Sequence, residues 1–236
     1  MLSIITPNLN NAKYIEENIL SISKLNIPFE HIIVDGGSSD NSLDIISKYP
    51  NIRLLHQTEK SGMYGAIDQG IKASRGEYIA YINADDRAIA SNFKEIQLAM
   101  NKRMYDVIYS DGNYYFTKDG SVSFGKGRLF GKFFLKHGCM PAIQPSIIFS
   151  KKIYDEVGGL RYDKFKICGD LDLFRRIAQI KKTIFKYIPK KTVIFMKRGD
   201  SLGDLNTSLF LKELKDNNIP TPNVLIRILF FIFKYI

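Results

Sequence analysis

The sequence predicts an α/β fold in which helices flank a central, mostly parallel sheet. Apolar runs and helical patterns alternate over residues 1–90, as is typical of strands joined by crossover helices. Polar clusters follow three of the four apolar runs, at the ends where open α/β sheets bind ligands. With 236 residues, 45% of them hydrophobic, the chain can bury such a core without disulfides.

In the first part of the chain, strands and helices are expected to alternate. Short apolar runs predict strands at 2–6, 31–34, 52–56 and 78–82. Apolar residues at spacings near three and four predict helices over 14–25, 42–48 and 64–73.

The second part of the chain is less regular. Apolar runs predict strands at 106–109, 113–117, 146–149, 184–188 and 192–196. Ser150 is expected to cap a short helix that ends at Gly158 and Gly159, and an amphipathic helix is expected to follow Gly169. Two further helices are expected over 206–216 and from 223 to the end, as a small C-terminal helical extension.

Composition limits the class of protein. Lys and Arg number 34 against 24 Asp and Glu, and the net charge of +10 favours an anionic partner. The two cysteines, Cys139 and Cys168, exclude a disulfide framework and indicate reduced thiols in a cytoplasmic protein. We expect no signal peptide, because neither a basic n-region nor an A-x-A cleavage site follows Met1. We expect no membrane-spanning helix, because no run reaches about 20 apolar residues.

Asp85 and Asp86 directly follow the predicted strand at 78–82. Adjacent carboxylates offer the hard oxygen ligands that Mg²⁺ and Mn²⁺ prefer. A cation there would neutralise a departing pyrophosphate. The alternative is a solvent-exposed acidic loop, and the position of the pair in line with the other polar clusters favours the metal site.

Residues 35–40 form a second cluster, with two glycines that permit positive φ and close approach to a ligand. Asp35 can accept a hydrogen bond from a nucleotide base or a ribose hydroxyl. The alternative is a tight turn in which Ser39 or Asp40 caps the next helix. The sequence contains neither a dinucleotide fingerprint nor a phosphate-binding loop of the G-x-x-x-x-G-K type.

Two further features lie near predicted helix starts. Lys60 and free N–H groups can face an anion, although core packing explains Met63 and Tyr64 equally well. Asp170 at a helix start suits a general base that faces a substrate hydroxyl. The alternative is that Asp170 and Asp172 are ordinary acids of a first helical turn.

Six segments together resemble glycosyltransferase family 2, of the inverting GT-A type. These segments are residues 3–8, 31–40, 62–71, 76–86, 144–146 and 169–175. The resemblance extends over residues 2–196 and is greatest to the branch that makes bacterial surface polysaccharides. It implies a GT-A fold with a Rossmann-like sheet.

The resemblance implies a role for each matching residue. Asp170 would be the catalytic base, and Asp86 and Asp85 would bind a divalent cation, Mn²⁺ or Mg²⁺, in a DXD-like motif. Gln144, Asp172 and Arg198 would lie on the acceptor side or in a loop that closes over the donor. The nucleotide would be bound by Thr6, Pro7, Asn8, Asp35, Lys60, Asn83, Ala84 and Asp85.

The resemblance also implies an activity and a domain plan. The chain would transfer a sugar, with inversion, from a nucleotide-sugar to a hydroxyl of a glycan or lipid-linked acceptor in capsule, exopolysaccharide or O-antigen synthesis. Residues 1–205 would form the GT-A domain, with a nucleotide-sugar-binding half at 1–110 and an acceptor-side half at 111–205. Residues 206–236 would form the helical extension.

The basic second half favours a cytoplasmic protein that attaches to the inner face of the membrane. The terminal helix can lie in the interface, and nearby cations can meet anionic head groups. These cations are Lys181, Lys182, Lys186, Lys190 and Lys191. The alternatives are a solvated basic face and a helix packed on its own domain or on a partner subunit, so an oligomer is compatible with the sequence.

A different class of function is a non-catalytic module that binds nucleic acid or polysaccharide. The net charge and the 13 Tyr and 16 Phe residues are compatible with it. Such a module has no need of Asp85 and Asp86 at a strand end, so we expect no nucleic-acid partner. A sugar nucleotidyltransferase would need a Gly-rich loop with Arg after the first strand, and residues 7–12 contain neither.

Overall fold

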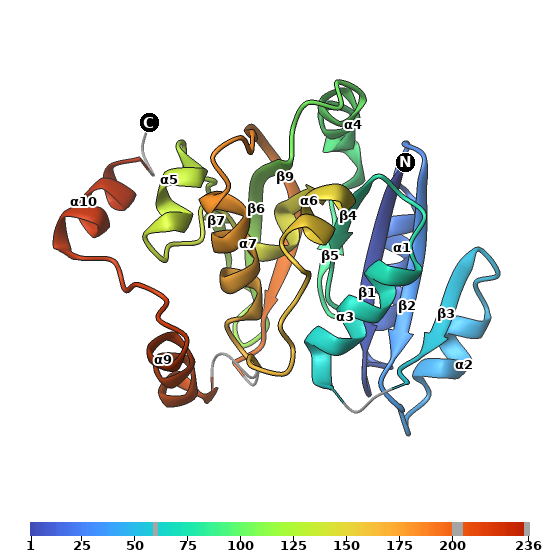
Figure 1. Cartoon of the computed structure of the whole chain (residues 1–236). Coiled ribbons are helices and arrows are strands. Elements are labelled where there is room, and N and C mark those ends of the chain that lie inside the picture. The colour runs from blue at the N-terminus through green and yellow to red at the C-terminus, as the bar shows by residue number, and fades with distance from the viewer. Residues whose placement is uncertain (59–60, 200–204, 234–236) are drawn as a thin grey trace.

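In the computed structural model, which describes residues 1–58, 61–199 and 205–233, nine strands form one sheet with helices on both faces (Figure 1). The first four strands are parallel and lie in the order β3-β2-β1-β4. They are β1 (Leu2–Asn8), β2 (Phe29–Asp35), β3 (Ile52–His56) and β4 (Tyr78–Tyr81). The helices between them are α1 (Ile15–Ser23), α2 (Ser42–Ser47) and α3 (Gly62–Ala73). The predicted alternation is confirmed.

The second part of the sheet is mixed. β8 (Ile147–Ser150) runs antiparallel between β4 and β6 (Val107–Phe116), and β9 (Phe185–Lys197) runs parallel to β6. The short strands β5 (Arg87–Ala88) and β7 (Val122–Gly125) pair antiparallel with β9 and β6. Six of the nine strands therefore point the same way, and the predicted α/β fold class is confirmed.

Two predictions of paired short strands were wrong. Of the residues predicted as separate strands, 107–109 and 113–116 belong to the single strand β6, and 185–188 and 192–196 belong to the single strand β9. A register shift at Ser110–Gly112 allows the polar middle of β6 to stay in the sheet. There, the buried Asp111 carboxylate accepts hydrogen bonds from Gly127 N and Tyr187 Oη, both at 2.7 Å.

Between β4 and β9, the described residues form six further helical segments. One helix that the sequence patterns did not predict is α4 (Phe93–Asn101), which follows the 3₁₀ turn η1 (Ala90–Asn92). The predicted cap is confirmed, because Ser150 Oγ accepts from Ile153 N at the start of α6. The other segments are α5 (Gly131–Lys136), η2 (Gln144–Ser146), α6 (Lys151–Glu156) and α7 (Gly169–Gln179).

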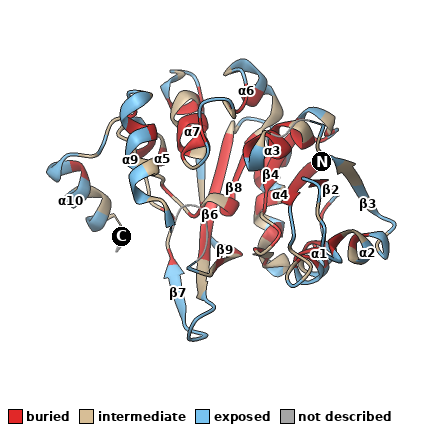
Figure 2. Cartoon of the chain, turned by 90° about the horizontal axis from the view of Figure 1, so that it is seen from below, coloured by how far each residue is buried: buried red, intermediate tan, exposed pale blue. Residues whose placement is uncertain are grey.

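The core has two sides because successive residues of a strand face opposite sides of the sheet. Ile5 packs in the cluster that includes α3, α6 and α7, whereas Ile4 packs in the cluster that includes α4. Figure 2 shows the buried strands enclosed between these helices, whose outer faces are exposed.

The two C-terminal helices differ in how they pack. Leu214 of α9 (Thr207–Asp216) is buried in the same cluster as Phe174 of α7. In contrast, α10 (Val224–Ile232) contacts α5 mainly through aromatic rings, such as Phe230 and Phe134 at 5.0 Å between ring centroids. In the described part of the chain, no helix is both long and apolar enough to cross a bilayer. The division at residue 205 stays a prediction.

We predict that His31 makes stability depend on pH. His31 is buried and lies 2.9 Å from Thr6 Oγ1, and burial lowers its pKa from 6.5 to about 3. Between these values the unfolded chain binds a proton that the folded chain does not. Stability from this group therefore falls as pH decreases, by up to about 1.4 kcal/mol per pH unit. The free energy of unfolding, measured with urea at several pH values from 5.0 to 6.5, should change less per pH unit in H31Q than in the parent protein.

The control for this experiment is H56Q, which removes an exposed histidine. Because other groups contribute to the pH dependence, the quantity to compare is the change in unfolding free energy per pH unit in each variant minus that in the parent. Equal changes per pH unit in H31Q and the parent protein would contradict the prediction.

Candidate functional site

Three polar clusters meet at the carboxyl edge of the parallel strands, which is the side seen in Figure 2. Asn8 at the end of β1 pairs in register with Asp35 at the end of β2. β4 pairs with β1 on its other side, so the loop of residues 83–86 lies beside them. Ligands of open α/β sheets bind at this edge.

Asp35 shapes the loop after β2. Its Oδ2 accepts from Gly37 N and Ser38 N, both at 2.9 Å, and its Oδ1 accepts from Ser38 Oγ at 2.5 Å and Asn8 Nδ2 at 2.8 Å. Gly37 has a φ of 95°, which favours glycine. Burial alone would raise the pKa of Asp35, but these hydrogen bonds lower it overall.

Asp86 is the structural member of the acidic pair. It is 1% exposed, and its carboxylate accepts from Met196 N at 2.9 Å and from Asn83 Nδ2 at 3.3 Å. Burial and the neighbouring Asp85 raise its pKa well above the usual value. The Asn18 amide of α1 donates to the backbone oxygens of Asn83 and Asp86 at 2.9 and 2.8 Å, which anchors the loop.

Asp85 is the member that reaches the surface, with its side chain 22% exposed. Arg198, just after β9, forms an ion pair with it at 3.4 Å. The Arg198 guanidinium also lies 3.4 Å from Asn11 Oδ1 and over the Tyr14 ring, 4.9 Å from its centroid. Arg198, which was expected to lie in a loop that closes over the donor, therefore contacts Asp85 of the acidic pair.

The residues present fit a cation that is shared with a ligand. Within 1–58, 61–199 and 205–233, no group of three or more His, Cys, Asp or Glu has the arrangement of a metal cage. Mg²⁺ is commonly bound by one or two carboxylates together with phosphate oxygens and water. Asp85 can supply such a carboxylate. Asp86, the predicted best ligand, has its oxygens engaged by the protein itself.

Asp170 lies in the first turn of α7 and is partly buried. Its Oδ1 accepts from Leu171 N at 2.8 Å and lies 3.2 Å from Tyr64 Oη. A Cβ on Gly169 would lie 2.7 Å from the Tyr64 ring, so glycine permits this close approach. Burial raises the pKa of Asp170 despite these hydrogen bonds. A carboxylate of raised pKa suits proton transfer near neutral pH.

Asp172 does not lie at the surface of the site, contrary to its predicted place on the acceptor side. It is 1% exposed and pairs with Arg176 Nε at 2.8 Å and with Arg161. Residues 170 and 172 are two apart, so they point in different directions on a helix. The Asp172 carboxylate is therefore engaged in ion pairs within the protein.

The remaining predicted residues have varied positions. Thr6 is fully buried against His31, and Pro7 and Ala84 are buried beside it at the same edge. Gln144 Nε2 donates to Tyr81 O at 3.1 Å, at the end of β4. Lys60 lies outside the described residues, as do Asp200 and Ser201, which follow Arg198 in the loop expected to close over the donor.

Three side-chain oxygens near this edge are buried without a partner among the described residues. They are Asn8 Oδ1 and Asn83 Oδ1, from the ends of β1 and β4, and Asn18 Oδ1 on α1. Buried acceptors are normally paired, so each calls for a donor from a ligand or a water molecule. Hydroxyl or N–H groups of a nucleoside would meet this need.

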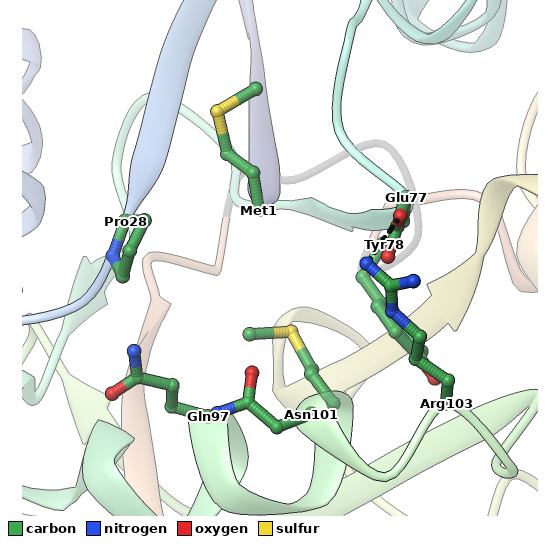
Figure 3. Close-up of a pocket in the computed structure, with 8 residues that line it drawn as sticks. Met1, Pro28, Glu77, Tyr78, Gln97, Asn101 and Arg103 are labelled. Carbon is green, nitrogen blue, oxygen red and sulfur yellow. Dashed lines mark ion pairs between the residues drawn. The ribbon is translucent and has the colours of Figure 1, made fainter.

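A separate hollow lies at the opposite edge of the sheet (Figure 3). Met1, Pro28 and Tyr78 line it at the amino ends of three strands, and Arg103 pairs there with Glu77 at 3.0 Å. Its volume of about 70 Å³ is small for a nucleotide. It also lies away from the polar clusters, so we do not assign it to the site.

Sequence reasoning missed two residues that organise the site. Asn18 is a polar residue among the buried Ile15, Ile19 and Ile22 of α1, and this polar position on an apolar face was a readable signal. Tyr64 was weighed as a core residue, and its ring is indeed buried. Its hydroxyl contact with Asp170, 106 residues later, had no local signal.

Sequence comparison finds relatives that are named glycosyltransferases. Glycosyltransferase GlyG of Streptococcus pneumoniae serotype 4 is 32% identical over 133 residues, which are 51% of this chain and 44% of that protein. The putative teichuronic acid biosynthesis glycosyltransferase TuaG of Bacillus subtilis is 33% identical over 92 residues, or 37% of this chain and 36% of that protein. The chain spans less than half the length of these relatives.

A solved structure shows the same fold. The crystal structure of S. aureus TarS 1-349 in complex with UDP superposes with a TM-score of 0.66 at 19% identity, covering 90% of this chain and 65% of that chain. This likeness confirms the fold expected from the resemblance. The model of glycosyl transferase family 2 matches residues 3–158, about two thirds of the sequence, and the chain therefore belongs to that family.

Proposed function

We propose that this chain is a glycosyltransferase that moves a sugar, with inversion, from a nucleotide-sugar donor to a hydroxyl of a glycan or lipid-linked acceptor. The observation that carries the proposal is Asp170, a partly buried carboxylate of raised pKa that lies 3.2 Å from Tyr64 Oη in the first turn of α3. Because α3 follows β3, this turn is at the carboxyl edge of the parallel strands, as is Asp85. The hydrogen bonds of Asp170 to Tyr64 and Leu171 both end on Oδ1. Within the described chain, Oδ2 is therefore left to accept a proton.

The proposed reaction is a single displacement. Asp170 removes the proton from the acceptor hydroxyl as that oxygen forms a bond to the anomeric carbon. The bond from this carbon to the diphosphate breaks at the same time, which inverts the configuration. Asp85 would hold a divalent cation, and when bound that cation neutralises the leaving diphosphate.

Similar solved structures and the polar groups of the site both support a nucleotide-sugar donor. Solved TarS structures contain UDP and UDP-GlcNAc, which makes these the first ligands to test. The unpartnered oxygens of Asn8 and Asn83 suit hydroxyl and N–H donors of a nucleoside. Relatives are named for teichuronic acid and PGL/p-HBAD biosynthesis, which supports a role in cell-surface polysaccharide or glycolipid synthesis.

We also propose that the α5–α10 face meets the membrane that carries the acceptor. Exposed apolar side chains on this face include Phe130, Phe133, Leu225, Ile228 and Phe231. The surrounding segments 120–154 and 217–236 contain no Asp or Glu. An apolar face within an all-basic region fits an interface with anionic head groups. Of the lysines predicted for this role, Lys182 and Lys190 instead pair with Glu156 and Glu95.

D170N should abolish turnover while donor binding survives. Loss of a general base typically costs about 10²- to 10⁴-fold in rate. Release of UDP from UDP-sugars with a glycan or lipid acceptor, together with calorimetry for UDP, measures the two effects separately. The control is D163N, which removes an exposed acid from the loop before α7. Turnover of D170N within a few fold of the parent would reject Asp170 as the base.

D85N should remove the metal dependence of UDP binding, because Asp85 is the exposed carboxylate of the pair. Calorimetric titration with UDP, with and without Mn²⁺, should show a Kd that Mn²⁺ improves in the parent protein and leaves unchanged in D85N. D86N should instead lower the melting temperature, because Asp86 holds Met196 N. Mn²⁺-dependent binding that persists in D85N would contradict this assignment.

Replacing Ile228 and Phe231 together with Glu should prevent membrane binding without unfolding the protein, because both side chains are at least 50% exposed. Flotation with phosphatidylglycerol vesicles should show binding by the parent, and the variant should lose about 10-fold or more of it. The matched control is V122E, an equally exposed apolar residue on β7. Equal flotation of both variants would exclude this face as the docking surface.

A further inference from the structure

Glu213, on helix α9, holds the loop that precedes α7. Its side chain is buried, at 6% exposure, and accepts from three consecutive backbone N–H groups. Lys166 N donates to Oε1 at 2.7 Å, and Ile167 N and Cys168 N donate to Oε2 at 3.1 and 2.9 Å. The next residues are Gly169 and Asp170, the start of α7.

A carboxylate is well suited to this position. Burying a charge is costly unless hydrogen bonds compensate it, and here three N–H groups at a helix start do so. In return, those amides obtain an acceptor that no neighbouring strand supplies. Removing the carboxylate would leave up to three N–H groups unpaired, which would favour rearrangement of the loop.

The same loop is held from its other side by α3. Tyr64 Oη donates to Ile167 O at 2.7 Å and lies 3.2 Å from Asp170 Oδ1. Its ring lies against Gly169. The position of Asp170 is therefore set between a tyrosine on α3 and a glutamate on α9, and α9 is itself fixed by Leu214 in the core.

We propose that Glu213 is a positioning residue that fixes Asp170 for its work as base, so that α9 is part of the active site. The kinetic part of this inference rests on the proposed function, whereas the hold on the loop does not. Both Asp170 and Glu213 lie beyond residues 3–158, the segment that the family model matches.

The negative charge of Glu213 also affects the pKa of Asp170. The titratable groups that act on Asp170 are Tyr64 of α3, Tyr81 of β4, Cys168 in the loop and Glu213 of α9. Glu213 is the carboxylate among them. Its negative charge adds to burial in raising the pKa of Asp170, while Leu171 N and Tyr64 oppose the rise. Replacing Glu213 with a neutral side chain should therefore lower this pKa.

The test compares E213Q with D216N, which removes an exposed charge from the same helix. In E213Q, amide hydrogen exchange at residues 166–168 should be about 10-fold faster or more. The pKa of Asp170, followed by carboxyl ¹³C NMR without substrate, should fall. Turnover should drop about 10-fold with the KM for UDP-sugar unchanged, and the acid limb of the rate profile should move to lower pH. D216N should match the parent.

Unchanged exchange at residues 166–168 in E213Q would overturn the proposal, and so would an unchanged pKa of Asp170. If E213Q does not fold, E213D keeps the charge but shortens the reach by one methylene, and faster exchange at these amides is again expected. If D170N is active and E213Q shows faster exchange, Asp170 is not the base but Glu213 does hold the loop. Failure of the proposed function can therefore be distinguished from failure of this inference.

Discussion

The geometry of the carboxyl edge of the parallel strands depends on the hydrogen bonds of the buried residue Asp86. Its carboxylate accepts Met196 N, from a strand 110 residues further along the chain. The backbone oxygen of the same residue accepts the Asn18 amide of α1. These contacts hold the end of β9 against the acidic loop, and Arg198, two residues after Met196, is thereby brought to Asp85. A buried, hydrogen-bonded polar group of this kind favours one arrangement over its alternatives.

Neighbouring acids in this chain have opposite environments. Asp86 and Asp172 are both 1% exposed, and the protein itself occupies their oxygens. Asp85 and Asp170, one and two residues away, lie nearer the surface of the candidate site. The same residue type therefore serves as an anchor in one position and as a candidate for chemistry in the next. Burial and available partners make the difference, because a buried carboxylate that accepts hydrogen bonds from the protein is less accessible to a ligand.

The two C-terminal helices have distinct places in the molecule. α9 packs into the core and reaches the loop before Asp170 through Glu213. α10 leaves a broad apolar face exposed beside α5. Of the two helices after the predicted boundary at residue 205, α9 therefore packs against the rest of the fold, and α10 offers an exposed surface.

The sequence by itself determined the alternation of strands and helices, the class of the fold and the edge at which the polar clusters meet. Each of these follows from local periodicity and from the direction of parallel strands. Only the tertiary structure decided that Asp85 rather than Asp86 reaches the surface, that β6 and β9 continue through polar residues, and that Glu213 binds the loop before Asp170. These features depend on partners 45 to 110 residues apart, and hydrogen bonds over such separations leave no periodic signal in the chain.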